Sequence, residues 1–390
     1  MTTQDWIENG LSELRALGME RTLRQFQTVG GKTRDGAHET LNFSSNDYLG
    51  LARSGKLAAA GAAALKSYGA GAASSRLVCG TLPCHAELER RLAAFKGYPE
   101  ALVFGSGYMA NLGVIPALAG RSDAIFADKL AHASLVDGAI LSRAELKRFR
   151  HNDPRHLSEL LASEKQARRR LVITESVFSM DGDLAPLEEI AEACSRHGAM
   201  LLVDEAHATG IFGPGGSGMV RELKLESRVD ISMGTMSKAF GAYGGFVACS
   251  APLRAWLVNR ARSFIFSTAL PPAVAGAAAG ALDTLASNPG LGRELLQRAQ
   301  AFRLRLKEAG FNTGVSASQI IPLIVGKNAR ALALAERLGE SGIIAVAIRP
   351  PTVPEGTARI RLSVTLDHSP RDLQNAADRI IDAGYKEGLL

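Results

Sequence analysis

Six short apolar segments alternate with helical stretches between residues 101 and 250, and this alternation limits the fold more than any other feature of the chain. The segments are ALVFGS (101–106), DAIFAD (123–128), RLVITES (170–176), AMLLVDEAH (199–207), DISMG (230–234) and GGFVACS (244–250). Between them, residues 157–167 and 187–198 show helical periodicity. Continuous apolar strands alternating with helices are typical of a mostly parallel sheet covered by helices on both faces. The sequence therefore predicts an α/β fold.

The pattern changes after about residue 285, where a smaller α+β domain is expected. A long helical stretch at 291–310 leads into the apolar run IIPLIVG, and the chain closes with the helical pattern DLQNAADRIIDAG. The chain has 390 residues, enough for two domains. We predict an N-terminal segment over 1–48, a large domain over 49–285 and a small C-terminal domain over 286–390.

Composition excludes several classes of function. The net charge of +6 is spread thinly along the chain, without a basic stripe interleaved with aromatic residues, so no nucleic-acid partner is expected. The spacing of the four cysteines resembles no zinc site, and we expect reduced thiols and no metal. No apolar stretch approaches the roughly 20 residues of a membrane span. The polar start, MTTQDWIENG, lacks the layout of a signal peptide, so a cytoplasmic location is expected.

Polar side chains follow several of the predicted strands at the point where each strand ends. They are Ser106, Asp128, Glu175 and Ser176, the Asp204–His207 stretch, and the Thr235–Lys238 stretch. In parallel α/β sheets, ligands bind beyond the carboxyl ends of the strands. The sequence therefore predicts a site at this edge of the sheet.

Three of these side chains, Lys238, Asp204 and His207, together indicate pyridoxal 5'-phosphate as a cofactor. This aldehyde needs a lysine that forms an imine and later moves protons, and an acid that keeps its ring nitrogen protonated. It also needs groups that bind its phosphate. The sequence GSGYMAN (105–111) opens a predicted helix whose amide groups suit an anion. The hydroxyls of Thr235 and Ser237 lie beside the lysine in sequence.

A dinucleotide site is the competing interpretation of the same glycines. Gly105, Gly107 and Ala110 follow a strand and fit a loose dinucleotide fingerprint, and Asp128 lies at about the right distance further on. That interpretation leaves Lys238 and the pair Asp204 and His207 without a role. We therefore favour pyridoxal phosphate.

Seven motifs, in the same order along the chain, resemble the α-oxoamine synthases, which belong to the fold-type I pyridoxal-phosphate enzymes. The motifs are SNDYLGL (45–51), SSRLVCGT (74–81), ADKLAHASLVDGA (127–139), RFRHND (148–153), ESVFSMDGD (175–183), VDEAHATG (203–210) and GTMSKAFGAYGG (234–245). The resemblance runs from about residue 40 to the C-terminus. It implies an aspartate aminotransferase-like fold, with a mostly parallel sheet in the large domain.

The resemblance also implies roles for single residues. Lys238 would hold the cofactor covalently, Asp204 would pair with its ring nitrogen, His207 would hydrogen-bond its phenolic oxygen, and His132 would stack on its ring. Gly107, Tyr108, Thr235 and Ser237 would lie at the phosphate, Ser179 would lie near the cofactor, and Thr268 would reach the phosphate in the partner subunit of a homodimer. Arg21, Arg349 and Thr352 would bind the substrate carboxylate or acyl chain, with Arg24 as the alternative to Arg21.

Within the family, the strings around 127–153 and VDEAHATG resemble most closely the biotin-pathway member, which condenses L-alanine with a pimeloyl thioester. Whether coenzyme A or acyl carrier protein carries the acyl group stays open. Sister members that use glycine or serine with other acyl groups remain alternatives, because they would share the same lysine, aspartate and histidine. An aminotransferase and a catalytically inactive partner subunit are the further alternatives, and the retained Lys238, Asp204, His207 and His132 argue against the second.

Overall fold

The computed structural model describes residues 3–23, 25–26, 30–35 and 38–390. These residues form two compact units. The first combines the residues up to Asn46 with Met180–Gly182 and Gln297–Leu390, and the second combines Asp47–Ser179 with Asp183–Leu296. The N-terminal residues, predicted to form a segment of their own, thus belong with the C-terminal residues. The reason is strand pairing, since Leu41 of β2 pairs in parallel with Ile343 of β11.

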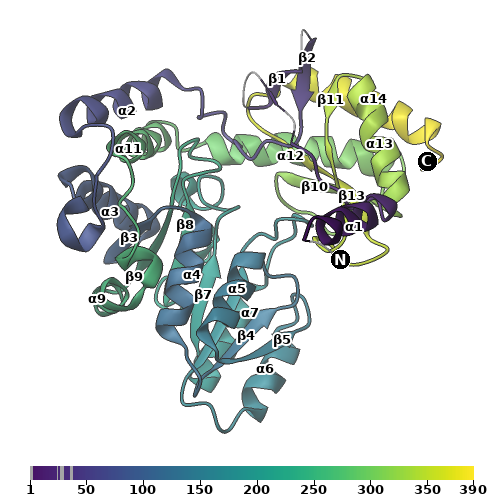
Figure 1. Cartoon of the computed structure of the whole chain (residues 1–390). Helices are drawn as coiled ribbons and strands as arrows, with labels where there is room; N and C mark the ends of the chain where they lie inside the picture. The colour runs from purple at the N-terminus through teal and green to yellow at the C-terminus, as the bar shows by residue number, and fades with distance from the viewer. Residues whose placement is uncertain (1–2, 24, 27–29, 36–37) are drawn as a thin grey trace. The chain divides into compact units, whose positions relative to one another are not determined.

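The second unit is built on a seven-stranded sheet with the order β3-β9-β8-β7-β6-β4-β5 (Figure 1). Its strands are β3 (Glu100–Phe104), β4 (Ala124–Asp128), β5 (Glu145–Phe149), β6 (Arg170–Glu175), β7 (Met200–Asp204), β8 (Ile231–Thr235) and β9 (Gly245–Cys249). β8, β7, β6, β4 and β5 pair in parallel, and β9 runs antiparallel to both of its neighbours, β8 and β3. The predicted α/β fold with a mostly parallel sheet is confirmed.

Helices of this unit connect the strands and pack against one another. They are α2 (Gly55–Tyr68), η1 (Arg76–Gly80), α3 (Pro83–Lys96), α4 (Gly107–Leu118), α5 (Ala133–Ser142), α6 (Pro154–Ser163), α7 (Leu187–His197), η2 (Pro214–Gly216), α8 (Met219–Glu222), α9 (Ala251–Arg260), α10 (Arg262–Ile265) and α11 (Pro272–Ser287). α4 packs on α5, α6 on α7, and α2 on α11 (Figure 1).

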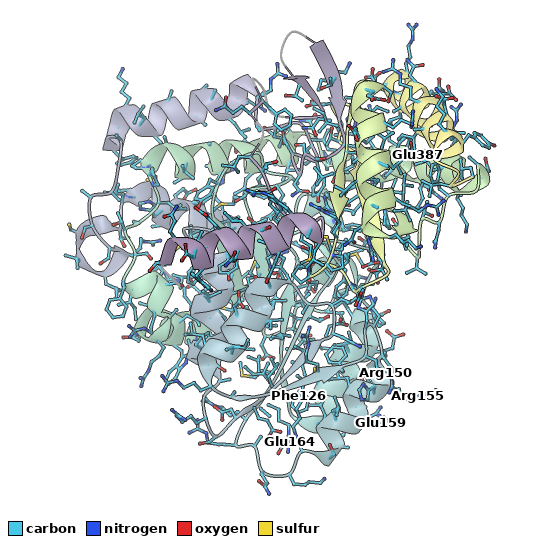
Figure 2. All side chains as sticks on the ribbon, turned by 45° about the vertical axis from the view of Figure 1, so that its right-hand side comes forward. Phe126, Arg150, Arg155, Glu159, Glu164 and Glu387 are labelled. Carbon is cyan, nitrogen blue, oxygen red and sulfur yellow. The ribbon has the colours of Figure 1, made fainter. Side chains whose placement is uncertain are left out.

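The core of this unit lies between the sheet and α4. Val114, Ile115 and Leu118 of α4 pack with apolar strand residues such as Ile173 and Leu202 in one buried cluster. Burial of this apolar surface is the main force that holds a helix on a sheet. Phe126 of β4 is fully buried, whereas Arg150 and Arg155 reach the surface beside α6 (Figure 2).

The first unit contains two three-stranded sheets, with the orders β1-β2-β11 and β10-β13-β12. The strands are β1 (Lys32–Asp35), β2 (His38–Asn42), β10 (Ile320–Gly326), β11 (Ile343–Ile344), β12 (Val346–Ile348) and β13 (Ala358–Ser363). The helices are α1 (Thr3–Ala16), α13 (Asn328–Glu340), α14 (Pro370–Lys386) and most of α12 (Leu291–Glu308). The C-terminal part of this unit begins at Gln297, inside α12, rather than at residue 286 as predicted. Among all the residues that the structure describes, no helix is long and apolar enough to cross a membrane.

Candidate active site

The carboxyl ends of neighbouring strands bring the predicted site residues of the second unit together. Asp204 ends β7 and lies in register with Glu175, which ends β6. Thr235 ends β8, the next strand in the sheet, and Lys238 follows three residues later. Because parallel strands present their carboxyl ends on one edge, these side chains share that edge.

Lys238 and His207 are in direct contact. Nζ of the half-buried Lys238 lies 2.8 Å from Nε2 of His207. The other ring nitrogen of His207, Nδ1, lies 2.7 Å from the hydroxyl of Tyr48. Three groups, a phenol, an imidazole and a primary amine, therefore form one hydrogen-bonded chain. Such a chain can position and exchange protons at the amine.

Asp204 is buried but well supplied with donors. Its side chain accepts a hydrogen bond from Asn111 Nδ2 at 3.0 Å and another from the main-chain nitrogen of Ala206 at 2.9 Å. Asn111, from α4, also donates to Ser134 Oγ at 2.9 Å. Hydrogen bonds from fixed donors set the orientation of a buried carboxylate. Asp204 is thus held in place by two elements other than its own strand.

His132 forms the N-terminal cap of α5, and the charges of Asp204 and Lys238 act on its ring. Its Nδ1 contacts Ser134 Oγ at 2.8 Å and accepts from Ser134 N at 3.2 Å. Burial lowers the pKa of His132, Asp204 acts to raise it, and Lys238 acts to lower it further. A neutral imidazole is the form suited to stacking on an aromatic cofactor ring.

Glu175 is a buried acid that the sequence analysis placed at the edge without a role. Its Oε1 accepts a hydrogen bond from the main-chain nitrogen of His132 at 2.7 Å. Burial, reinforced by the charge of Asp204, raises its pKa well above the ordinary range. Of these two carboxyl groups in register, Glu175 is the one that its surroundings favour as a neutral acid.

The first turn of α4 lies at the strand ends and presents main-chain amides that suit an anion, and we refer to it as the cradle. Gly107 begins the helix, and Ser106 caps it by accepting from Met109 N at 3.1 Å. The first amide groups of a helix have no partners within the helix, so they can bind an anion. A Cβ atom on Gly245 would lie 2.5 Å from Gly107 N, so only glycine permits this approach of β9 to the helix. A Cβ atom on Gly107 would lie 3.6 Å from Cβ of Thr235, which brings the threonine to the same place.

The other residues of this unit that were predicted at the cofactor lie on separate segments of the chain. The Thr235 hydroxyl donates to Gly244 O at 2.9 Å, and Ser237 N donates to Thr235 Oγ1 at 3.2 Å. Tyr108 is partly exposed, and the hydrogen bond from its hydroxyl to Asp137 raises its pKa. Ser179 is buried in the loop after β6, and Thr268 is exposed on a segment that pairs with Ser75.

The predicted substrate residues lie in the first unit and line one cavity. Arg21, Arg349 and Thr352 surround a cavity of about 770 Å³, together with Arg15 and Glu336. Nη2 of Arg21 lies 3.4 Å from the Thr352 hydroxyl, and Arg349 donates a short hydrogen bond to Gly18 O. The structure thus brings these three residues together. Arg24, the alternative to Arg21, lies outside the described residues.

Sequence reasoning missed Tyr48, Asn111 and Arg361. Tyr48 and Asn111 belong to motifs that were quoted, SNDYLGL and GSGYMAN, but a motif does not tell which member turns inward. Arg361 is buried in β13, where it donates to Asn46 Oδ1 at 3.2 Å and to Ser363 Oγ at 2.8 Å. Arginines alternating with apolar residues in the strand ARIRLS were the signal that could have drawn attention to it, because arginine is rarely buried.

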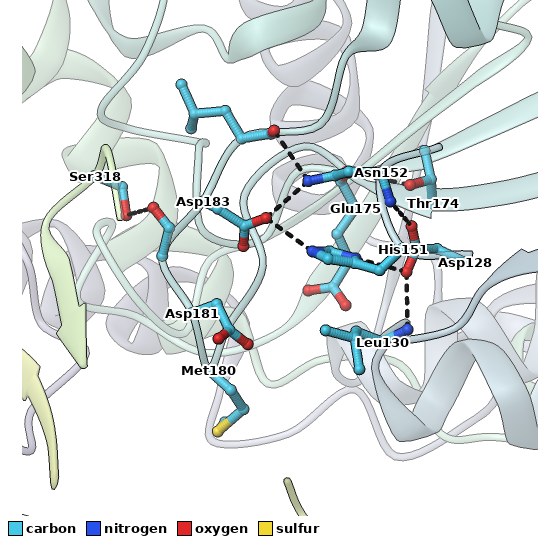
Figure 3. Close-up of polar contacts among 12 residues, drawn as sticks. Asp128, Leu130, His151, Asn152, Thr174, Glu175, Met180, Asp181, Asp183 and Ser318 are labelled. Carbon is cyan, nitrogen blue, oxygen red and sulfur yellow. Dashed lines mark hydrogen bonds and ion pairs between the residues drawn. The ribbon is translucent and has the colours of Figure 1, made fainter. Parts of the chain in front are cut away.

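A second buried network lies at the ends of β4 and β5 (Figure 3). His151 bridges two carboxylates, with Nδ1 2.9 Å from Asp128 Oδ1 and Nε2 2.8 Å from Asp183 Oδ2. Asn152 also joins both acids, through its main-chain nitrogen to Asp128 and its side chain to Asp183. Burial opposes the charged ring, but the hydrogen bonds to Asp128 and Asp183 prevail and raise the pKa of His151 to about 10.

We expect the His151 network to make stability depend on pH above neutrality. A histidine pKa that is raised by folding contributes stability that is complete below the unfolded-state value of about 6.5 and is lost as pH rises through the folded-state value. The unfolding free energy of the wild type should therefore exceed that of His151→Gln by about 2 kcal/mol at pH 6, and the difference should shrink toward pH 10. Urea unfolding at both pH values measures it. A difference that is constant with pH would contradict the charged state of His151.

The residues at the strand ends fit pyridoxal phosphate. They offer a primary amine beside a histidine and a carboxylate that accepts hydrogen bonds. They also offer a helix N-terminus that is left open because residue 245 is a glycine and has no side chain. The orphaned side-chain oxygen of Asn111, buried without a partner next to Asp204, is a further polar group directed into this region. When bound, the cofactor supplies an aldehyde that captures amines and a ring that accepts electrons.

Comparison with known proteins agrees with the site. Residues 38–380 match the family described as aminotransferase class I and II, and the chain belongs to this family of pyridoxal-phosphate enzymes. The predicted cofactor and enzyme class are therefore confirmed. Among curated relatives, 8-amino-7-oxononanoate synthase of Anaeromyxobacter dehalogenans is 50% identical over 365 residues, covering 93% of this chain and 92% of the relative. That of Geobacter sulfurreducens is 46% identical over 387 residues, covering 98% and 99%. The resemblance to the α-oxoamine synthases is confirmed.

Solved structures show the same fold. A structure described as SPT (serine palmitoyltransferase) with a PLP (pyridoxal phosphate) internal aldimine has a TM-score of 0.92 and 33% identity. The match covers 99% of this chain and 98% of that one. The 8-amino-7-oxononanoate synthase of Francisella tularensis has a TM-score of 0.77 and 29% identity, covering 90% and 99%. Structural similarity thus does not separate the members of the family from one another.

Proposed function

We propose that the chain catalyses the decarboxylative condensation of L-alanine with a pimeloyl thioester, giving 8-amino-7-oxononanoate, carbon dioxide and the free thiol, as a step of biotin biosynthesis. The observation that carries the chemistry is the contact between Lys238 Nζ and His207 Nε2 at 2.8 Å, beside the buried Asp204. The choice of substrates rests on the identity of 50% to a relative named for this product, against 33% to the structure described as SPT. We place the reaction in the cytoplasm, where acyl thioesters are made.

Each residue of the site then has a defined task. Lys238 would hold the cofactor covalently, and its amine, when free, would remove the proton from the Cα atom of the amino acid. Asp204 keeps a proton on the ring nitrogen of the cofactor, which makes the ring a better acceptor of electrons. His207 hydrogen-bonds the phenolic oxygen, and His132 covers the ring. Ser179 lies near the cofactor.

The phosphate is assigned to the cradle at the start of α4. The amides of Gly107 and Tyr108 point out of the first helical turn, where the helix dipole favours negative charge. Thr235 and Ser237 add hydroxyls from the opposite side, since Thr235 lies against Gly107. Because the cradle is made of main-chain amides and short hydroxyls, it holds the phosphate without long flexible side chains.

The cavity of Arg21, Arg349 and Thr352 is assigned to the far end of the acyl chain. A pimeloyl group ends in a carboxylate, and guanidinium groups bind carboxylates with strong, charge-assisted hydrogen bonds. Two arginines and a threonine hydroxyl meet in this cavity. Acetyl and palmitoyl groups have no terminal carboxylate, so they could not form these hydrogen bonds with the two arginines.

Arg21→Gln should therefore discriminate between acyl donors. Loss of one charge-assisted hydrogen bond should raise the KM for the pimeloyl thioester about 10- to 100-fold. A heptanoyl thioester, which has the same length but no terminal carboxylate, should be used equally by both proteins. Steady-state kinetics with the two donors measures this. Arg15→Gln is the matched control, because Arg15 lines the same cavity but its guanidinium pairs with Glu20. Equal losses with both donors would contradict the assignment.

We also propose that the active protein is a homodimer with shared sites. Large apolar side chains are exposed on η1, directly after α10 and a few residues after Lys238, namely Leu77, Val78, Phe266 and Tyr243. Val78 is 78% exposed and Phe266 is 69% exposed, which is unfavourable in a monomer. Thr268, two residues after Phe266, would then reach the phosphate of the partner subunit. Light scattering tests this against the chain mass of 41.2 kDa.

Product formation with a panel of substrates tests the reaction itself. Carbon dioxide release is measured with alanine, glycine and serine, each against pimeloyl, succinyl, acetyl and palmitoyl thioesters. We expect alanine with the pimeloyl donor to exceed every other pair. Preference for glycine or serine would assign the chain to a sister activity, and transfer of an amino group to a keto acid would assign it to the aminotransferases. Presenting the pimeloyl group on coenzyme A and on acyl carrier protein identifies the carrier.

A further inference from the structure

Tyr48 belongs to the motif SNDYLGL, which the proposed reaction leaves without a task. Its side chain is fully buried, and its hydroxyl lies 2.7 Å from Nδ1 of His207. The ring centroids of the two residues are 6.0 Å apart and their planes are tilted by 54°. The hydrogen bond rather than ring stacking therefore links them.

The backbone around Tyr48 is fixed by its neighbour. Both carboxylate oxygens of Asp47 accept main-chain hydrogen bonds, one from Leu51 N at 2.9 Å and one from Ala52 N at 3.1 Å. These bonds close the turn that carries Tyr48. The hydroxyl is thus presented to His207 by a rigid element, which is what a positioning group requires.

The two nitrogens of a neutral imidazole divide the roles of donor and acceptor between them. A partner that donates to Nδ1 leaves the proton on Nε2, and a partner that accepts from Nδ1 removes it from Nε2. Nε2 of His207 is the nitrogen that faces Lys238, at 2.8 Å from Nζ. The hydrogen bond between Tyr48 and Nδ1 therefore decides whether Nε2 of His207 donates or accepts a hydrogen bond at Lys238.

We propose that Tyr48 is a positioning residue that donates its hydroxyl proton to Nδ1 of His207 and so keeps the other nitrogen, Nε2, as a proton donor toward the groups bound at Lys238. A lysine that acts as a base must be a neutral amine, and a neutral amine accepts a hydrogen bond from its neighbour. A phenolic oxygen opposite His207 also requires a donor. Both demands are met only by the tautomer with the proton on Nε2. The inference rests on the proposed role of His207.

A merely structural role for Tyr48 predicts a different outcome, and Tyr98 provides the comparison. Tyr98 is also buried in the second unit, and its hydroxyl donates to Val229 O at 2.9 Å. Tyr98→Phe and Tyr48→Phe each remove one buried hydroxyl and one hydrogen bond. If packing alone matters, the two variants should resemble each other in every measurement.

The test measures the tautomer of His207 in the purified protein with its cofactor bound. Nitrogen-15 chemical shifts of labelled histidines, with His207 assigned by substitution, should show the proton on Nε2 in the wild type. In Tyr48→Phe they should show it moved wholly or partly to Nδ1, and in Tyr98→Phe they should match the wild type. A wild-type proton on Nδ1 would overturn the proposal without need of any variant.

Spectroscopy and kinetics give two further measurements. The pH at which the visible absorbance of the Lys238-bound cofactor titrates should rise by about one unit in Tyr48→Phe, because the proton shared with the phenolic oxygen is held more tightly when that oxygen loses its donor. kcat should fall about 10- to 100-fold with the KM for L-alanine changed less than about threefold. Unchanged histidine shifts and an unchanged titration midpoint in Tyr48→Phe would overturn the proposal. The first two measurements need no substrate, so they decide it even if the condensation assay fails.

Discussion

Lys238→Ala is expected to abolish turnover, with a loss of at least about 10⁴-fold in kcat. The side chain performs two tasks, since it tethers the cofactor and removes the Cα proton, and alanine can perform neither. Its Nζ lies 2.8 Å from Nε2 of His207.

The loss of the tether and the loss of the base can be measured separately. Borohydride should reduce the wild type to a protein with the cofactor covalently attached, and mass spectrometry should find no such mass in Lys238→Ala. Added methylamine should restore a small part of the turnover, because a soluble amine can replace the base but not its position. Lys129→Ala, at an exposed position beyond the end of β4, should behave as the wild type. Full activity of Lys238→Ala would refute the assigned site.

Asp204→Asn is expected to reduce kcat about 10³-fold while the cofactor still binds. An amide cannot hold a proton on the ring nitrogen as a carboxylate does, so the bound ring accepts electrons poorly. The fold should tolerate the change: Asn111 donates to Oδ2 and Ala206 N to Oδ1, so the amide keeps one of these two hydrogen bonds. Deuterium exchange at Cα of L-alanine, followed without any acyl donor, isolates the proton-removal step.

Asp230→Asn is the matched control for this variant. Asp230 is also an acid in contact with β7, but it accepts from Leu201 N at the amino end of the strand, away from the site. Its substitution should leave deuterium exchange unchanged. Exchange at the wild-type rate in Asp204→Asn would show that the ring nitrogen needs no carboxylate here.

Five of the six strands read from the sequence lie in the interior of the sheet, and the sixth, β3, lies at one edge but is almost wholly buried. They were recognisable because a strand buried on both faces reads as a continuous apolar run. β5, with the sequence ELKRF, was missed, and its position explains why. It lies at the edge of the sheet, pairs only with β4, and leaves most of its side chains partly or fully exposed. Its charged residues therefore carry no apolar pattern.

The site was predictable where it depends on strand ends and not where it depends on tertiary packing. The edge shared by Asp204, Glu175 and Thr235 followed from the parallel order of the strands. The bond from Tyr48 to His207 joins residues 159 positions apart, and that from Asn111 to Asp204 joins residues 93 apart. No local periodicity encodes which buried polar group meets which, so these partners appeared only in three dimensions.

The first unit is built from chain segments that are far apart in sequence, and this affects the order in which the protein can fold during synthesis. The residues up to Asn46 are synthesised before Gln297–Leu390, with which they form the first unit, and β2 has to wait for β11. At about 5 to 20 residues per second, roughly 15 to 60 s separate the synthesis of these strands. The seven-stranded sheet is complete in sequence by Cys249 and can form meanwhile. Arg21 is therefore synthesised well before Arg349, and the cavity that both residues line can assemble only after the later one has been made.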